Sequence, residues 1–253
     1  MSEARSALVT GAGSGIGRAV ALALLDAGFT VTLAGRRADA LDETVALASK
    51  TSDAVTLTVS ADITDPEQVD ALFAQHAARF GRLDVLINNA GVFGPTADVG
   101  DLRPDDWQST WAVNVTGAVL CAGAAFRLMR AQHPQGGRII DNGSISAQTP
   151  RPLSVAYTTT KHAIAGLTKS IELDGRAYGI TATQLDIGNA RTALVDALVG
   201  DGALQADGSR RAEPSFDVAH VASLVATVAA LPSDVSVPQL TVTAAGMPFI
   251  GRG

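Results

Sequence analysis

Short apolar runs rich in β-branched residues alternate along this chain with longer segments in which apolar residues recur at helical spacing. Apolar runs of this kind, ended by glycine or polar turn residues, are typical of buried strands. Seven of them predict strands: ALVT (7–10), TVTLAG (30–35), VTLTVS (55–60), LDVLINNAG (83–91), RIIDN (138–142), ITATQL (180–185) and QLTVT (239–243).

The intervening segments predict helices. Apolar residues spaced by three or four positions indicate one helix over 16–24 and another over 41–48. A third is predicted within 65–81, because Asp65 is a good N-cap, Pro66 suits the first helical position and Gly81 can end the helix.

Strands that alternate with helices form βαβ units, so the sequence predicts an α/β fold. We expect residues 1–253 to form one doubly wound domain, a seven-stranded parallel sheet with helices on both faces and right-handed crossovers. A barrel of eight β/α units also fits the length, but it fits the glycine cluster after the first strand less well.

One long stretch, 199–214, has three glycines and no apolar period. It is interpreted as a mobile loop over the substrate site, and a disordered surface loop remains the alternative.

Composition and net charge indicate which kind of ligand the protein binds. The chain has 47% hydrophobic and 17% charged residues and a formal net charge of -6. A nucleic-acid surface would be basic, so an acidic chain of this kind is predicted to handle small molecules and not to bind nucleic acid.

No apolar leader follows the start of the chain, and no window approaches ~18 uninterrupted apolar residues, so no membrane segment is predicted. The single cysteine, Cys121, cannot form an internal disulfide and is expected to be a buried structural thiol in a cytoplasmic protein. Four scattered histidines and one cysteine give no ligand cluster, so no metal site is expected.

A glycine-rich turn follows the first strand. The stretch VTGAGSGIGRAV carries glycines at 11, 13, 15 and 17 between a strand and a helix. Backbone N–H groups and a helix N-terminus can face a pyrophosphate there, as in a Rossmann-type nucleotide site. A tight turn with close helix packing is the alternative.

Charge at the end of the second strand bears on the cofactor. Gly35 stands where an NAD-binding protein would carry an acidic residue, and Arg36 and Arg37 follow it. Guanidinium groups suit a 2′-phosphate, so NADP(H) is predicted over NAD(H), which remains possible. A solvated basic pair at a helix start is the alternative.

Tyr157 and Lys161 are four positions apart in AYTTTKHA. Side chains at this spacing are neighbours on a helix, so the ammonium can stabilise a phenolate and lower the tyrosine pKa. Tyr157 would then be a usable proton donor. For an isolated pair, a buried tyrosine with a lysine at its edge is the better interpretation.

The motifs TGAGSGIG, LINNAG, WAVNVTG, IIDNGSIS and YTTTK occur in the order and at roughly the spacings of the short-chain dehydrogenase/reductase family, which the chain resembles over nearly its whole length. Ser144 lies thirteen residues before Tyr157. The resemblance implies that Tyr157 exchanges a proton with the substrate oxygen and that Ser144 hydrogen-bonds it. Lys161 would lower the Tyr157 pKa and bind the nicotinamide ribose, and Asn114 would hold a water chain. By themselves, Ser144 could be a strand-end hydroxyl and Asn114 a capping amide.

The same resemblance implies cofactor contacts. Asp62 would accept from the adenine, although it could be an ordinary turn residue. The family's usual proline before Gly188 is Ile187 in this chain, a departure that bears on the nicotinamide-side wall. The implied cofactor contacts are Gly11, Gly13, Ser14, Ile16, Arg36, Arg37, Asp62, Ile63, Asn89, Ala90, Gly91, Tyr157, Lys161, Gly188, Ala190 and Thr192.

The substrate pocket is expected to combine apolar residues with arginines that could meet a carboxylate or face water: Phe93, Leu153, Leu194, Arg151, Arg210 and Arg211, with Asp186, Asn189 and 199–214 nearby. The predicted function is hydride transfer between NADP(H) and a ketone or secondary alcohol in a homotetramer or homodimer. The alternative is a redox-inactive nicotinamide-nucleotide sensor or scaffold, because a fold alone does not prove activity.

Overall fold

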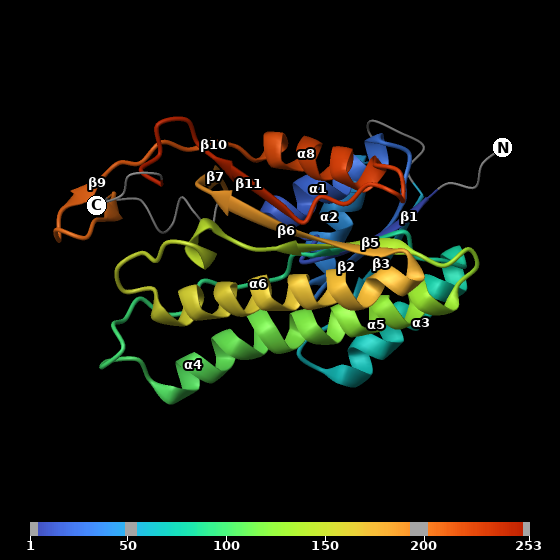
Figure 1. Ribbon diagram of the computed structural model, residues 1–253, viewed down its shortest axis with the longest axis horizontal. Coiled ribbons are helices and arrows are strands. Elements are labelled where there is room, and N and C mark those ends of the chain that lie inside the picture. The colour runs from blue at the N-terminus through green and yellow to red at the C-terminus, as the bar shows by residue number, and fades with distance from the viewer. Residues whose placement is uncertain (1–4, 49–54, 193–201, 250–253) are drawn as a thin grey trace.

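The computed structural model describes residues 5–48, 55–192 and 202–249. Seven parallel strands form one sheet in the order β11-β6-β5-β4-β1-β2-β3, which confirms the predicted doubly wound fold (Figure 1). The strands are β1 (Ser6–Thr10), β2 (Thr30–Gly35), β3 (Thr56–Ser60), β4 (Val85–Asn88), β5 (Gly137–Asn142), β6 (Ile180–Gly188) and β11 (Gln239–Thr243).

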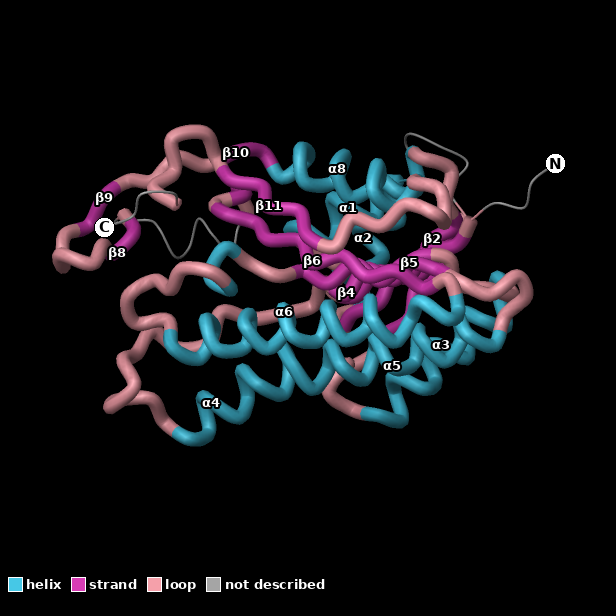
Figure 2. Tube along the Cα trace, in the orientation of Figure 1, coloured by secondary structure: helices cyan, strands magenta, loops and turns pink. Residues whose placement is uncertain are grey.

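Helices cover both faces of the sheet (Figures 1 and 2). Successive side chains of β1 point to opposite faces: Ala7 and Val9 join one buried cluster and Leu8 joins the other. Both faces of the sheet are therefore buried, and this is why the strand sequences are continuous apolar runs. One face carries α1 (Gly15–Asp26), α2 (Ala38–Ala48) and α8 (Val218–Ala230), and the other carries α3 (Pro66–Phe80), α4 (Pro104–Trp111), α5 (Ala118–Ala131) and α6 (Val155–Gly175).

The ends of α3 follow from its sequence. Asp65 accepts hydrogen bonds from the N–H groups of Glu67 and Gln68, Pro66 is the first helical residue, and Gly81 ends the helix with a left-handed φ of 77°. The predicted caps are confirmed at both ends.

Parallel strands place all their carboxyl ends at one edge of the sheet. β1 pairs with β2 on one side and with β4 on the other, so the chain order reverses at β1. A crevice opens at such a switch point, and ligands of doubly wound proteins bind there.

The segment 104–131 runs through α4, a π-helical stretch η1 (Ala112–Gly117) and α5. By length and composition alone it could cross a membrane, but 44% of its apolar window is buried inside the fold. Packing of α5 against α3 and α6 accounts for the apolar composition, so the segment is weak evidence for a membrane span.

Part of the stretch predicted to be irregular is structured. β8 (Ala203–Leu204) and β9 (Arg210–Arg211) form an antiparallel hairpin at one end of the molecule (Figure 2), and β10 (Phe216–Asp217) pairs with β7 (Ala190–Arg191). Residues 199–201 and Leu194 lie outside the described residues. The predicted mobility of the loop stays a prediction.

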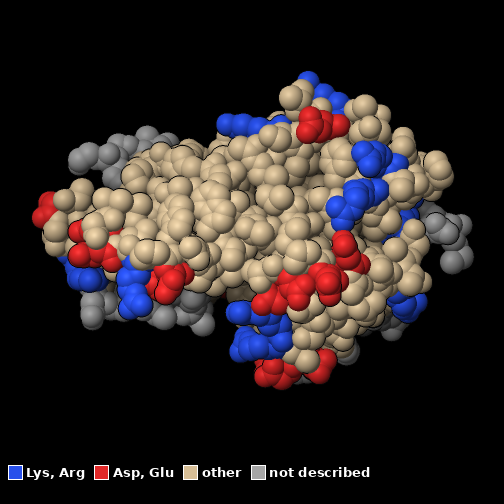
Figure 3. Space-filling view, turned by 90° about the horizontal axis from the view of Figure 1, so that it is seen from below, with Lys and Arg blue, Asp and Glu red and all other residues tan. Residues whose placement is uncertain are grey.

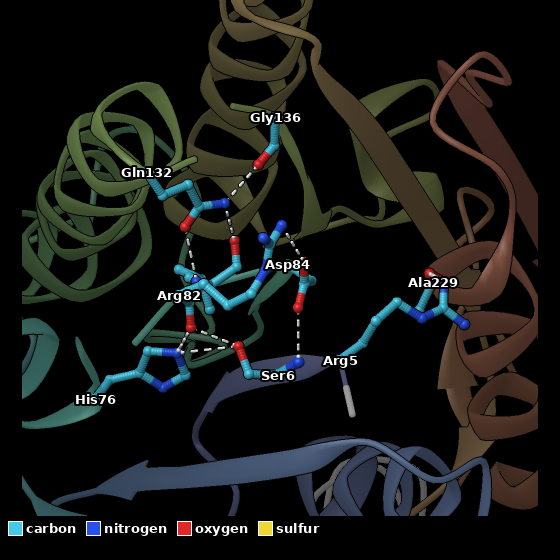
Figure 4. A network of polar contacts seen from close by, with 9 residues as sticks. Arg5, Ser6, His76, Arg82, Asp84, Gln132, Gly136 and Ala229 are labelled. Carbon is cyan, nitrogen blue, oxygen red and sulfur yellow. Dashed lines mark hydrogen bonds and ion pairs between the residues drawn. The ribbon is translucent and has the colours of Figure 1, made fainter. Parts of the chain in front are cut away.

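A polar network ties β1 to the segment before β4 at the edge opposite the crevice (Figure 4). The N–H of Ser6 donates to Asp84 (2.8 Å), and Arg82 forms an ion pair with the same carboxylate (2.7 Å). His76 is fully buried; one ring nitrogen lies 2.9 Å from the carbonyl oxygen of Arg82 and the other 2.8 Å from Oγ1 of Thr32. The network is distant from the crevice and stabilises the fold.

His76 makes stability depend on pH. Burial lowers the pKa of His76 below its ordinary 6.5, against smaller opposing effects of the hydrogen bond with the Arg82 backbone and of the Asp84 charge. The unfolded chain therefore takes up a proton as pH falls through about 6.5 while the folded protein does not, so stability is lost in that window. Urea midpoints at pH 7.5 and 5.5 should differ more for the natural protein than for His76→Gln; equal differences would contradict the expectation.

Candidate active site

A cleft of about 620 Å³ lies at the carboxyl edge of the sheet, where the strand order reverses. Its wall brings together the ends of β1, β2, β3 and β4 with one side of α6. The lining residues are Gly11, Gly13, Ser14, Gly15, Ile16, Gly17, Gly35, Arg36, Arg37, Ala40, Leu41, Ala61, Asp62, Ile63, Asn89, Ala90, Gly91, Val92, Phe93, Val113, Asn142, Tyr157, Lys161 and Thr192.

The glycine-rich turn fits a phosphate group. Gly11 has a left-handed φ of 68°, and a Cβ there would lie 2.9 Å from Nδ2 of Asn89. A Cβ on Gly17 would overlap the carbonyl oxygen of Gly11. The Ser14 side chain makes no capping hydrogen bond to α1. The first turn of α1 therefore presents backbone N–H groups to the cleft without a side chain over them.

Two arginines at the end of β2 are free to meet a ligand. The exposed Arg36 and Arg37 line the cleft, and neither guanidinium forms a hydrogen bond or ion pair with another described residue. Arg18, in contrast, is bonded within the protein. It pairs with Glu43 (2.8 Å) and donates to the carbonyl oxygen of Gly13 (2.6 Å).

Asp62 is a turn residue on the cleft wall, and its contact with an adenine stays a prediction. Its Oδ1 accepts from the N–H (2.9 Å) and the hydroxyl (2.8 Å) of Thr64, which makes it a turn residue. The backbone hydrogen bond from Thr64 is the largest cause that lowers the Asp62 pKa, and Arg36 adds to it. The residue also lines the cleft.

The end of β4 is held by a residue that the sequence analysis did not assign to the site. The Thr10 hydroxyl accepts from the N–H groups of Asn89 (2.9 Å) and Ala90 (3.0 Å), and Asn89 Nδ2 donates to the Thr10 carbonyl (2.9 Å). Asn142 donates to Asn89 Oδ1 (2.9 Å). The threonine that precedes the first glycine was the available signal for this role.

Tyr157 and Lys161 meet on the cleft side of α6, as their spacing predicts. The Lys161 ammonium lies 5.6 Å from the centroid of the Tyr157 ring and donates to the Asn142 carbonyl at 2.6 Å. Tyr157 also contacts Phe93, and the centroids of the two rings are 4.8 Å apart. Lys161 is buried, and Tyr157 is partly exposed to the cleft.

The electrostatics of the pair differ from the prediction. Burial raises the pKa of Tyr157, while a hydrogen bond with Ser144 and the charge of Arg151 lower it and Asp186 raises it. Burial also lowers the Lys161 pKa to about 8, against the charges of Asp141 and Asp186. The expected lowering of the tyrosine pKa is wrong for this state of the protein, because desolvation of the phenol outweighs the neighbouring charges.

Asp141 is a second feature that the sequence analysis missed. Its carboxylate is buried on β5 and accepts from Asn88 Nδ2 (3.0 Å) and the Thr168 hydroxyl (2.8 Å). Burial raises its pKa to about 6, and the charge of Lys161 opposes the rise. An aspartate inside the apolar run RIIDN was the available signal, since buried carboxylates need partners.

Ser144 lies at the carboxyl end of β5, where it caps a short turn, η2 (Ile145–Ala147). Its Oγ accepts from the N–H of Ser146 at 3.1 Å, and its own N–H donates to Asp186 at 3.0 Å. A hydrogen bond between the side chains of Ser144 and Tyr157 brings Ser144 to the Tyr157–Lys161 pair, as the family resemblance implies.

Asn114 lies in the π-helical stretch η1, and its amide is bonded to protein. Its Oδ1 accepts from the N–H of Val92 (2.8 Å), and Nδ2 donates to the Val92 carbonyl (2.8 Å) and to Thr160 (3.1 Å). It holds the strand-four loop against α6, and its role in a water chain stays a prediction.

The predicted contacts at and after the end of β6 divide into two groups. Thr192 lines the cleft. Gly188 is buried beneath Ile145, where a Cβ would lie 2.9 Å from Sδ of Met247, and Ala190 is buried on β7. Contacts of Gly188 and Ala190 with a cofactor therefore stay predictions.

Of the arginines considered for the substrate, Arg151 is engaged within the protein. It pairs with the buried carboxylate of Glu213 at 2.7 Å and donates to Asn189 at 2.9 Å. Arg211 pairs with Asp207 on the surface, and Arg210 donates to the carbonyl oxygen of Gly202. Arg151 would have to give up a buried ion pair to bind a substrate carboxylate.

Cys121 is buried on α5, as predicted. Burial raises the pKa of its thiol to about 12, which makes it a poor nucleophile.

Residues 5–201 match the short chain dehydrogenase family. The chain belongs to this family. It is 34% identical over 189 residues to a 3beta-hydroxysteroid dehydrogenase of Mediterraneibacter gnavus, covering 75% of this chain and 67% of the relative. It is 37% identical to the cis-4-hydroxycyclohexanecarboxylate dehydrogenase of Sinomonas cyclohexanicum, covering 78% of each. The acetoin dehydrogenase structure from Enterobacter cloacae has a TM-score of 0.83 at 30% identity, covering 100% of this chain and 98% of that one.

Family membership confirms the resemblance and the reaction class. The relatives are dehydrogenases or reductases of alcohol and carbonyl groups, so this short-chain dehydrogenase is an oxidoreductase, and its fold is one that binds a nicotinamide cofactor.

Proposed function

We propose that this short-chain dehydrogenase transfers a hydride between NADP(H) and a ketone or secondary alcohol, with Tyr157 as the proton donor and acceptor. The observation that carries the proposal is the meeting of Tyr157, Lys161 and Ser144 beside the glycine-rich cleft. A nucleotide sensor would need the cleft but would have no use for a phenol, an ammonium and a hydroxyl at one end of it.

The cleft has places for each part of the cofactor. The glycine-rich turn and the first turn of α1 suit the pyrophosphate, and Asp62 and Ile63, which line the same cleft, would contact the adenine. Lys161 lines the same cleft and would contact the ribose of the nicotinamide. When bound, the cofactor supplies or accepts the hydride.

The protein's own side chains would carry out the proton transfer. Tyr157 would donate its phenolic proton to the carbonyl oxygen during reduction and take it back during oxidation, and Ser144 would hold the oxygen by a hydrogen bond. Because burial raises the Tyr157 pKa, the phenol keeps its proton at neutral pH and is ready to act as an acid.

Two observations support a proposal for the substrate class: the cleft wall near Tyr157 and the names of the relatives. Phe93, Val92 and Val113 provide an apolar wall near Tyr157. The names of two relatives specify a hydroxyl group on a steroid and on a cyclohexane ring. We propose a ketone or secondary alcohol on an apolar, ring-shaped body as the substrate.

The test combines binding and turnover. Nicotinamide fluorescence on mixing with NADPH reports binding, and a panel of cyclic ketones, steroid ketones and open-chain ketones then reports oxidation of NADPH. Turnover of a ring ketone supports the proposal. Binding without turnover of any carbonyl would favour the redox-inactive sensor.

Arg36 is expected to set the cofactor preference. Its guanidinium is exposed on the cleft wall and can meet a 2′-phosphate by a charge-assisted hydrogen bond. Arg36→Ala should weaken NADPH binding by roughly tenfold to a hundredfold more than NADH binding, on the order of 1–3 kcal/mol. The dissociation constants of both cofactors, measured by fluorescence, give the ratio.

Arg79→Ala is the matched control, because Arg79 is an exposed arginine in the last turn of α3. It should leave the ratio unchanged. If Arg36→Ala weakens both cofactors equally, Arg36 is a solvated surface residue and the NADP preference fails.

We also propose that the protein is a homodimer or homotetramer. Uncharged side chains cover most of the middle of the face formed by α4, α5 and α6 (Figure 3). Val119 on α5 and Leu173 on α6 are 45% and 61% exposed. A second copy packed on this face would remove apolar surface from water.

A further inference from the structure

We propose that Asp186 is a positioning residue for Ser144, holding the turn that carries this hydroxyl and presenting a fixed negative charge to the proton-transfer site. The proposal rests on the function proposed above. Asp186 is fully buried on β6, which pairs directly with β5, the strand that ends at Asn142 two residues before Ser144.

The carboxylate of Asp186 contacts both ends of one turn. Its Oδ1 accepts from the N–H of Ser144 at 3.0 Å, immediately before η2. Its Oδ2 accepts from Nε2 of Gln148 at 2.8 Å, immediately after η2. A short turn fixed at both ends by one rigid group has little freedom to move its serine.

The surroundings are built for this carboxylate. Gln184 donates to Oδ1 and Gln239 donates to Oδ2, each at 2.8 Å, so each oxygen accepts two hydrogen bonds. Four accepted bonds and no donated one suit an ionised carboxylate. Gly143 leaves room for it, because a Cβ on Gly143 would overlap Oδ1 of Asp186.

All four donors are neutral amides, and Asp186 forms no ion pair with the described residues. Its charge therefore acts on its neighbours. It raises the pKa of Tyr157, where Arg151 from the loop before α6 and the Ser144 hydrogen bond oppose it. It also raises the pKa of Lys161 on α6, together with Asp141 on β5.

Geometry and charge can be separated by two substitutions. Asp186→Asn keeps the shape and an oxygen toward Ser144 but removes the charge. Its new NH2 group faces Gln148 and Gln239, whose side-chain amides can turn over to accept from it. It should retain most of the turnover and shift the Tyr157 ionisation to lower pH. Asp186→Ala removes both, so it should reduce kcat roughly tenfold or more through misplacement of Ser144, with little change in the KM for NADPH.

Phenolate absorbance at alkaline pH reads the charge effect without any turnover. The chain has two tyrosines, so a Tyr178→Phe background leaves the Tyr157 titration alone. The titration midpoint of this background should fall by more than half a pH unit when Asp186→Asn is added. This measurement needs no turnover and stays valid even if no carbonyl is reduced. A failure of the proposed function can therefore be distinguished from a failure of the role proposed for Asp186.

Gln148→Ala provides a second, milder variant if Asp186→Ala does not fold. It releases one end of the turn and leaves the Asp186 charge in place. It should reduce kcat several-fold without moving the Tyr157 titration. Normal kcat in both Asp186→Ala and Gln148→Ala would overturn the positioning role, and an unmoved titration in Asp186→Asn would overturn the charge effect.

Discussion

Tyr157→Phe should reduce carbonyl turnover by about a thousandfold or more while NADPH still binds. The change deletes the phenolic proton and leaves the ring, its contact with Phe93 and the glycine-rich turn in place. General acid catalysis by one side chain is worth roughly 10²–10⁴-fold, which sets the scale of the loss. Steady-state kcat with the best ketone of the panel and the NADPH dissociation constant are the two measurements.

Tyr178→Phe is the matched control, because Tyr178 follows α6 and packs edge-on against Phe126 with ring centroids 6.0 Å apart, outside the cleft wall. Its kcat should equal that of the natural protein. A Tyr157→Phe protein that keeps more than a few per cent of its activity would remove Tyr157 from the proton transfer. Loss of NADPH binding would instead show that the ring supports the cleft.

The fold could be predicted because its signals are local. Strands buried on both faces must be apolar at every position, as Ala7, Leu8 and Val9 are, and such runs are readable without knowing their partners. The ends of α3 were equally local, since Asp65 caps the helix through N–H groups two and three residues away. The glycines of the first turn and the Tyr157–Lys161 spacing are also local signals, because each involves residues close together in the sequence.

The parts of the site that could not be predicted depend on residues far apart in the chain. Asp186 meets Gln239 because β11 pairs with β6, and it meets Gln148 because β5, which leads into η2, pairs with β6 on the other side. No spacing rule connects these three positions. Arg151 and Glu213 pair across 62 positions in the same way. From the sequence alone, substrate and water stayed open as alternative partners of Arg151.

The sign of the Tyr157 pKa shift illustrates the same limit. Helical spacing shows that an ammonium is near, but it does not show how much water the fold removes from the phenol. Lys161 itself is buried, and its ammonium donates to the Asn142 carbonyl. Desolvation, a property of the whole packed cleft, decides the direction.

Lys161→Met should reduce kcat by about a hundredfold and weaken NADPH binding, because it removes a charge beside the proton donor and a contact to the cofactor while keeping a long apolar stem. Burial lowers the Lys161 pKa to about 8, so the ammonium is present below that pH and is lost as the pH rises through it. The kcat/KM of the natural protein reports the free enzyme and should therefore fall above about pH 8.

This alkaline decrease should be absent from Lys161→Met, whose low kcat/KM should stay flat until Tyr157 ionises at higher pH. Lys169→Met is the control, since Lys169 is exposed on the same helix two turns later and should keep the natural profile. A Lys161→Met protein with unchanged NADPH affinity would contradict the cofactor contact. A decrease near pH 8 that persists in this variant would assign the titration to another group, and Asp141, with a pKa of about 6, lies too low to account for it.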